Sequence, residues 1–201
     1  MRKRTRTCAD ADNNCTGLEQ ETCTNDFKRN QIIYGDITIS ETFEISISLN
    51  LADNVQSDYA NIIGFQKEGV PSWQSQHPER PPGSKVPAVF LYPKRNILHI
   101  CTTIDDDGNA CWNSEEMPIN TWFKLNIRQQ KLGKKYEFQI LINDEIKHTK
   151  TNNQPMVFEG VNGVIANSYH PERNYPPPIG QYKDFRFILK GDDFVYFIYF
   201  Q

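Results

Sequence analysis

The ten residues from Thr42 to Leu51, TFEISISLNL, decide the fold class of this chain. Apolar side chains occupy alternate positions at Phe43, Ile45, Ile47 and Leu49, and polar ones lie between them at Glu44, Ser46 and Ser48. Because successive side chains of a β-strand point to opposite faces of a sheet, this alternation predicts a strand with one buried and one solvent-facing side.

Segments of the same kind continue along the chain, and no window of about twelve residues shows a convincing 3.6-residue period. These segments are YANIIGF (59–65), VPAVFLY (86–92), NILHICTTI (96–104), WFKLNIRQQ (122–130), KYEFQILIND (135–144), EIKHTK (145–150), MVFEGVNGVIANSY (156–169), QYKDFRFIL (181–189) and DFVYFIYF (193–200). The sequence therefore predicts an all-β protein, a single antiparallel β-sandwich of about a dozen short strands.

The composition agrees with this prediction and excludes several classes of partner. The 201 residues include 12 prolines, and 12% of them are aromatic, which suits a β domain with many turns. A net charge of −3 and a pI of about 5.8 provide no basic field for nucleic acid or an anionic membrane. Since no run of roughly 18 apolar residues is present, we expect no membrane span.

Residues 1–28 are predicted to form a polar N-terminal arm that carries Cys8, Cys15 and Cys23. Their spacing lacks the paired CxxC pattern of a zinc site, and the arm offers no apolar core in which free thiols could be buried. Asn14 begins the sequon Asn14-Cys15-Thr16 and is the expected glycosylation site. We therefore expect an oxidising, extracellular or cell-surface location, with any signal peptide already removed.

The middle of the chain resembles a known superfamily. PAVFL (87–91) leads to LHIC (98–101) and a hairpin that returns to a second cysteine, and WFKLNI (122–127) and FQILIND (138–144) follow. A late crossing segment reads ANSYHPERNYPPPIGQYKDF (166–185). Over residues 31–190 these motifs resemble the laminin-G-like branch of the concanavalin-A-like lectin/glucanase superfamily. The resemblance implies a jelly-roll sandwich over residues 29–201, of a kind used outside cells to recognise a glycan or a protein.

The same superfamily contains glucanases, whose catalytic carboxylates lie on an E-x-D-x-E strand. This chain has no such strand, and it has no G-x-S-x-G, HExxH, P-loop or dinucleotide-binding motif. We therefore predict that it is not an enzyme but a recognition or adhesion module without a cofactor. A structural subunit of an extracellular assembly is the alternative, and a glycoside-acting enzyme is the weaker third reading.

The stretch CTTIDDDGNAC places Cys101 and Cys111 on the two arms of a hairpin, with the turn expected at Asp107-Gly108-Asn109. A hairpin of that length brings facing cysteines within disulfide distance, and we expect Trp112 to pack on the disulfide. Asp105, Asp107 and Asn109 also offer alternating oxygens of the kind that bind Ca²⁺, which makes them the candidate metal ligands. A solvated turn without an ion is the simpler interpretation of three adjacent acids.

Two proline-rich loops carry the candidate ligand-binding residues, and both contain the tetrapeptide HPER. Sugar recognition uses aromatic platforms and planar polar side chains, because a pyranose ring has an apolar face ringed by hydroxyls. We expect the recognition surface on the concave face of the sandwich or at its rim. The candidates are Trp73, His77 and Arg80 in the first loop and Tyr169, His170, Arg173 and Tyr175 in the second. If the loops met, His77, Glu79, His170 and Glu172 could also bind a metal, although a coincidence is the favoured interpretation of the repeated tetrapeptide.

The apolar run from Phe194 to Phe200 is too short to cross a membrane and would promote aggregation if exposed. We predict that it forms a paired strand beside the early strand around Gln31 to Ile39, with its outward face as a contact surface. The run and the N-terminal cysteines are the two features through which chains could assemble.

Overall fold

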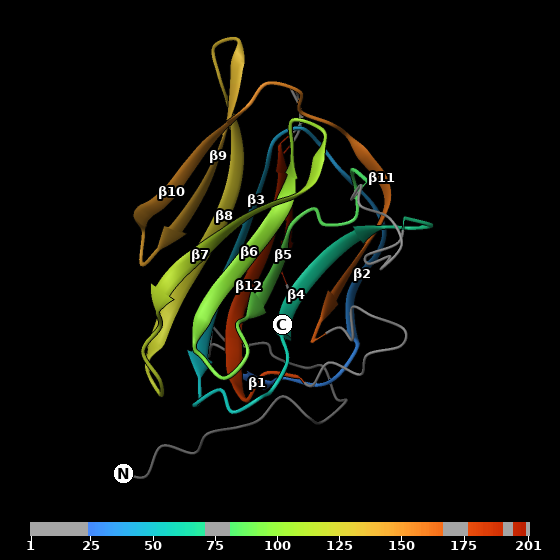
Figure 1. The fold of residues 1–201 in the computed structure, drawn as a ribbon. Coiled ribbons are helices and arrows are strands. Elements are labelled where there is room, and N and C mark those ends of the chain that lie inside the picture. The colour runs from blue at the N-terminus through green and yellow to red at the C-terminus, as the bar shows by residue number, and fades with distance from the viewer. Residues whose placement is uncertain (1–23, 71–80, 167–176, 191–194, 200–201) are drawn as a thin grey trace, which may run out of the picture.

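The computed structural model describes residues 24–70, 81–166, 177–190 and 195–199. These residues form thirteen β-strands and no helix, so none of them belongs to a helix that could cross a membrane. The strands make two antiparallel sheets that pack face to face (Figure 1). The predicted all-β jelly-roll sandwich is therefore confirmed.

Each sheet combines strands that are neighbours in the sequence with strands that are far apart in it. The seven-stranded sheet runs β1 (Asn25–Asp26), β12 (Gly180–Lys190), β3 (Phe43–Leu51), β8 (Trp122–Leu132), β9 (Lys135–Ile142) and β10 (Glu145–Asn152), and β13 (Val195–Tyr199) also pairs with β12. The six-stranded sheet runs β2 (Gln31–Ile39), β11 (Phe158–Ile165), β4 (Ala60–Lys67), β5 (Ala88–Leu91), β6 (Ile97–Ile104) and β7 (Asp107–Glu116).

The core lies between the sheets and uses the alternation seen in the sequence. On β3, Ile45, Ile47 and Leu49 are at most 2% exposed and pack against the inward side chains of the opposite sheet. Phe65 of β4 and Phe187 of β12 meet across the core, with ring centroids 5.1 Å apart. Burial of this continuous apolar layer is the main force holding the two sheets together.

Tight hairpins connect several neighbouring strands. Asp105 and Asp106 have φ of 51° and 69°, and Asn143 and Asp144 have φ of 51° and 65°. Two consecutive residues with positive φ match the twist of a two-residue hairpin, and Asn and Asp tolerate this conformation. The predicted turn between β9 and β10 is confirmed. The turn between β6 and β7 lies two residues earlier than predicted, so Asp107 and Asn109 belong to β7.

The C-terminal run does form a paired strand, but the predicted partner is wrong. β13 pairs antiparallel with β12, from Arg186 opposite Tyr199 to Lys190 opposite Val195. The early strand β2 pairs with β11 in the other sheet. A hairpin connection places β13 beside its neighbour in sequence, which costs less loop-closure entropy than a return to the start of the domain.

Candidate functional site

The loop residues predicted to bind a ligand lie outside the described residues. Trp73, His77 and Arg80 fall within 71–80, and Tyr169, His170, Arg173 and Tyr175 fall within 167–176. The candidate glycosylation site Asn14 and the cysteines of the arm fall within 1–23. Their roles stay predictions.

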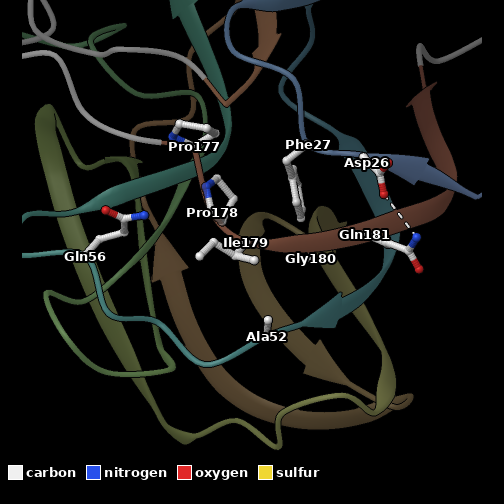
Figure 2. A pocket seen from close by; sticks show the side chains of 9 residues that line it. All are labelled: Asp26, Phe27, Ala52, Gln56, Pro177, Pro178, Ile179, Gly180 and Gln181. Carbon is white, nitrogen blue, oxygen red and sulfur yellow. Dashed lines mark hydrogen bonds between the residues drawn. The ribbon is translucent and has the colours of Figure 1, made fainter.

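A pocket of about 450 Å³ lies at the rim, where the described chain resumes after the second of these loops. Pro177, Pro178 and Ile179 form an apolar wall, and Figure 2 shows Phe27 facing them across the pocket. To one side, Gln181 Nε2 donates a hydrogen bond to Asp26 Oδ1 at 3.0 Å. The pocket therefore extends from Pro177, where the described chain resumes, to the start of β12.

The three candidate calcium ligands each accept hydrogen bonds from the protein. Asp105 Oδ1 accepts from the backbone amides of Asn153 and Gln154, at 2.5 and 3.1 Å. Asp107 Oδ1 accepts from the backbone amide of Asn109 at 2.8 Å, and Asn109 Oδ1 accepts from the ammonium of Lys85. These contacts tie the hairpin turn to the loop after β10 and to the segment before β5. Calcium binding by these residues stays a prediction.

Cys101 of β6 and Cys111 of β7 lie directly opposite each other and form the predicted disulfide, with an S–S distance of 2.11 Å. The disulfide lies on the outward face of its sheet. Trp112, by contrast, points inward and packs against the core. The expectation that Trp112 packs on the disulfide is therefore wrong, because adjacent residues of a strand face opposite sides.

Trp112 instead helps to close the side of the sandwich where β7 and β10 form the two sheet edges. Its ring stacks on His148 of β10, with centroids 5.8 Å apart and an interplanar angle of 23°. Partial burial, with a smaller contribution from the Lys150 ammonium, lowers the pKa of His148. The imidazole is thereby favoured in its neutral form against the indole.

The outward face of the seven-stranded sheet, which we call the polar face, carries mostly polar side chains. Its members come from four neighbouring strands, and the strand register places them in rows. They are Glu44, Ser46, Ser48 and Asn50 of β3, Trp122, Lys124, Asn126, Arg128 and Gln130 of β8, Glu137, Gln139 and Leu141 of β9, and Gln181, Lys183, Asp184, Arg186 and Ile188 of β12.

Asn126 lies at the centre of the polar face and is only 6% exposed, although it points away from the core. Its Nδ2 donates a hydrogen bond to Glu44 Oε1 at 2.7 Å, which fixes the orientation of the amide. Among the residues that the structure describes, no donor reaches Oδ1 of Asn126 or Oδ1 of Asn50, and both oxygens are buried. A buried acceptor without a partner costs about 1–3 kcal/mol, so a site of this kind calls for an explanation.

Beside Asn126, a hydrogen-bond network fixes planar side chains across β8 and β9. Arg128 Nε and Gln130 Nε2 donate to Gln139 Oε1, at 2.7 and 3.4 Å, and Gln139 Nε2 donates to Glu137 Oε1 at 2.5 Å. Gln139 is 5% exposed. The network holds amide, guanidinium and carboxylate groups in fixed positions on an outward surface.

An aromatic side chain lies at the other end of the polar face. Trp122, with 36% of its surface exposed, lies beside Asn50 on the neighbouring strand. The ammonium of Lys183 sits 4.5 Å from the centroid of the indole, within range for a cation–π contact. From Trp122 to Arg128 the face extends roughly 20 Å along β8, at about 3.3 Å per residue.

No family model matches the chain, and no curated protein matches it in sequence. Solved structures do match it. A heptameric SAP-like pentraxin from Limulus polyphemus aligns over 82% of this chain and 74% of its own, with 7% identity and a TM-score of 0.52. The chain has a concanavalin-A-like jelly-roll fold.

A protein described as carbohydrate-binding, from Bacteroides ovatus, aligns over 85% of this chain with 14% identity and a TM-score of 0.55. The match covers 44% of that protein's chain. Identities this low establish the shared fold and nothing about a shared ligand.

The expectation that the chain is not an enzyme needs a correction. An alginate lyase from Alteromonas sp. 272 matches 76% of this chain and 73% of its own, with 5% identity and a TM-score of 0.46. A match this weak assigns no activity to this chain. The prediction that the chain is not an enzyme is wrong as an exclusion, because missing glucanase motifs do not exclude another chemistry.

The sequence did not single out the polar face as a site. Its residues occupy the polar positions of alternating strands, and such positions are usually solvated. The burial of Asn126 and Gln139 distinguishes the polar face from an ordinary solvated surface, and that burial depends on side chains from three neighbouring strands.

Proposed function

We propose that the chain is a glycan-binding module and that the polar face is its binding site. The observation that carries this proposal is the position of Asn126 on the outward face, where its Oδ1 is buried and has no donor among the described residues. Rotation of a side chain that covers this oxygen would admit a sugar hydroxyl, whose hydrogen bond would remove the cost of the unsatisfied oxygen.

The surrounding groups fit the chemistry of a pyranose ring. A sugar presents hydroxyls that donate and accept hydrogen bonds, and Arg128, Gln139 and Glu137 offer both functions in fixed geometry. It also presents an apolar face of C–H groups, which could pack on the exposed surface of Trp122. The buried oxygen of Asn50 lies beside this tryptophan and offers a second acceptor.

The charges of the polar face favour a neutral glycan over an acidic one. Cations and carboxylates are interspersed on it, and Lys124 pairs with Asp144 at 2.7 Å. The cations are Lys124, Arg128, Lys183 and Arg186, and the carboxylates are Glu44, Glu137 and Asp184. Mixed charges create little net field, so polar contacts would provide most of the recognition.

The test is binding of the purified chain to an array of neutral and acidic glycans, followed by calorimetry on the best ligand. Asn126→Ala removes this oxygen and should weaken binding about five- to tenfold, since a hydrogen bond contributes about 1–1.5 kcal/mol. Asn162→Ala is the matched control, because Asn162 lies on β11 of the other sheet and accepts from the backbone amide of Asp36.

Equal losses in the two variants, or unchanged affinity in Asn126→Ala, would contradict the assignment of the site. Failure of the chain to bind any glycan would contradict the function itself. Incubation of each bound glycan with the protein, with chain length measured afterwards, distinguishes binding from turnover.

We further propose an extracellular location. The Cys101–Cys111 disulfide supports it, because structural disulfides persist in oxidising compartments. Localisation of the full-length protein in its native cell, by fractionation, tests this directly; recovery from the cytosol with free thiols would contradict it.

A further inference from the structure

A second cluster of chemically reactive side chains lies on the outward face of the six-stranded sheet. His99 and Cys101 are two residues apart on β6 and therefore share a face, and Cys111 lies opposite Cys101 on β7. One nitrogen of His99 and the two sulfur atoms all lie within 4.8 Å of one another. Nε2 of His99 is 3.2 Å from Sγ of Cys101.

The imidazole is oriented so that a nitrogen lone pair faces the sulfur atoms. Nδ1 of His99 lies 2.6 Å from Oδ1 of Asn113, on β7. An amide oxygen only accepts hydrogen bonds, so Nδ1 carries the proton and Nε2 is the unprotonated nitrogen. Metal-binding histidines are commonly fixed in this way, by a hydrogen bond from the second ring nitrogen.

Aromatic rings enclose the same imidazole. The centroid of His99 lies 5.3 Å from Tyr59, 5.6 Å from Tyr92 and 6.2 Å from Phe90. Phe90 and Ala88 form a small apolar cluster on this face, separate from the main core. The rings hold the imidazole in place and shield one side of the cluster from water.

We propose that reduction of the Cys101–Cys111 disulfide creates a binding site for a thiophilic divalent cation, Zn²⁺ above all, with His99, Cys101 and Cys111 as its three ligands. In the oxidised protein the sulfur atoms are bonded to each other, and the site is closed. Binding at this site is independent of the polar face.

The redox step balances with an external dithiol as reductant. One thiolate of the dithiol attacks Sγ of Cys111, which is exposed, and the S–S bond breaks with its electron pair on Cys101. The second thiolate of the dithiol then releases Cys111 and leaves the dithiol as a disulfide, so two electrons pass to the protein. Zn²⁺ binds the two thiolates and the neutral imidazole, and any thiol protons are released to solvent.

Cross-strand placement suits the geometry of zinc. Tetrahedral sites have Zn–S distances of about 2.3 Å and Zn–N distances of about 2.0 Å, so ligand atoms lie roughly 3–4 Å apart. Small side-chain rotations after the S–S bond breaks would reach these distances without moving the strands. Three protein ligands leave the fourth position open to solvent on the side of Cys111.

The experiment measures Co²⁺ and Zn²⁺ binding to the oxidised and the reduced full chain. A phosphine reduces the disulfide, with water supplying the oxygen of the phosphine oxide, and anaerobic gel filtration removes it. Co²⁺ reports thiolate ligands through its charge-transfer absorption, and Zn²⁺ competition gives the affinity. Each measurement is repeated in a background with serine at Cys8, Cys15 and Cys23, which lie outside the described residues and could bind metal themselves.

The reduced background protein should bind one ion per chain, and the oxidised protein should not. His99→Ala should weaken binding at least about tenfold, and Asn113→Ala should weaken it by about 10–100-fold. His148→Ala is the matched control: it removes another partly buried histidine that contacts an aromatic ring, and it should change affinity less than about twofold.

Equal affinity in His99→Ala and His148→Ala would overturn the proposal, as would metal binding that survives in Cys101→Ser/Cys111→Ser. Near-ultraviolet circular dichroism follows folding throughout. A reduced chain that unfolds and does not refold with Zn²⁺ would also overturn it.

Discussion

The outward faces of the two sheets arise from the same alternation but have different chemistry. On the seven-stranded sheet, the polar face holds amides, guanidinium groups and carboxylates, with Asn126 and Gln139 buried among them. On the six-stranded sheet, Phe90 packs with Tyr59, and Thr103 is buried. Thr103 Oγ1 accepts from the amide of Gly83 and donates to the carbonyl of Lys85, so the chain itself covers this part of the face.

A polar side chain that is buried on an outward face can either be bonded to the protein itself or be left without a partner. Where a loop covers the face, buried polar groups such as Thr103 have protein partners. On the polar face, the buried oxygens of Asn50 and Asn126 have no donor among the described residues, and this difference supports the proposal that the face binds a ligand.

The largest expected effect comes from the end of the polar face, where β12 meets β3. Gly180 has a φ of +143°, and a Cβ there would lie 2.4 Å from the carbonyl oxygen of Asn50. Because the contact is with backbone, Gly180→Ala should reduce the free energy of unfolding by about 3–5 kcal/mol, measured by urea denaturation. Gly133→Ala is the control: its φ is +65° with open space around it, so about 1 kcal/mol is expected. Equal losses of unfolding free energy in the two variants would contradict the close approach of Gly180 to the backbone of Asn50.

The second-largest effect is expected when one aromatic residue on each face is replaced by alanine. Phe90 is 6% exposed, and Phe90→Ala should cost about 3 kcal/mol of unfolding free energy through lost packing. Trp122→Ala on the polar face should cost less than about 1 kcal/mol and should weaken glycan binding instead. Thermal or urea unfolding and calorimetry on the same samples measure both quantities. A large loss of stability in Trp122→Ala, together with weaker glycan binding in Phe90→Ala, would contradict the roles assigned to the two faces.

A smaller effect on stability is expected when Asn126 is replaced by leucine, which has a similar shape. Leucine removes the unsatisfied buried oxygen but also the hydrogen bond from Nδ2 to Glu44, so the two effects should nearly cancel. Stability should change by less than about 1 kcal/mol in either direction, while glycan binding is lost. Urea denaturation with and without glycan measures both. A loss of more than about 2 kcal/mol would show that Asn126 is structural, like Thr103.

The smallest effect is the pH dependence due to His148, at the edge where the two sheets meet. Burial lowers the pKa of His148 in the folded protein below the unfolded value of about 6.5. On acidification, His148 takes up a proton in the unfolded chain before it does so in the folded protein. The contribution of neutral His148 to the free energy of unfolding is therefore complete above pH 6.5 and is lost as the pH falls through the folded pKa. The difference in unfolding midpoint between pH 7.5 and pH 5 should therefore be smaller in His148→Gln than in the natural protein; an identical difference would contradict the shift.

Much of the fold follows from short-range patterns. The alternation in residues 42–51 predicts β3 and its buried side, and the Asn143-Asp144 turn predicts the β9–β10 hairpin. The spacing of Cys101 and Cys111 predicts their disulfide, although the turn between them lies at Asp105-Asp106. The glycine at position 108 favours a later turn than the structure has, because Asp105 and Asp106 adopt positive φ instead.

The sequence by itself therefore determined the β class, most strand positions and the disulfide. Backbone stereochemistry sets a period of two along every strand, and residues within one hairpin meet without any distant partner. Only the tertiary structure decided that β13 pairs with β12 and that Trp112 meets His148. It also decided that the amide of Asn126 is buried on an outward face. The last two features depend on contacts between segments far apart in the chain. In all three, packing and loop closure choose among arrangements that the local pattern leaves equal.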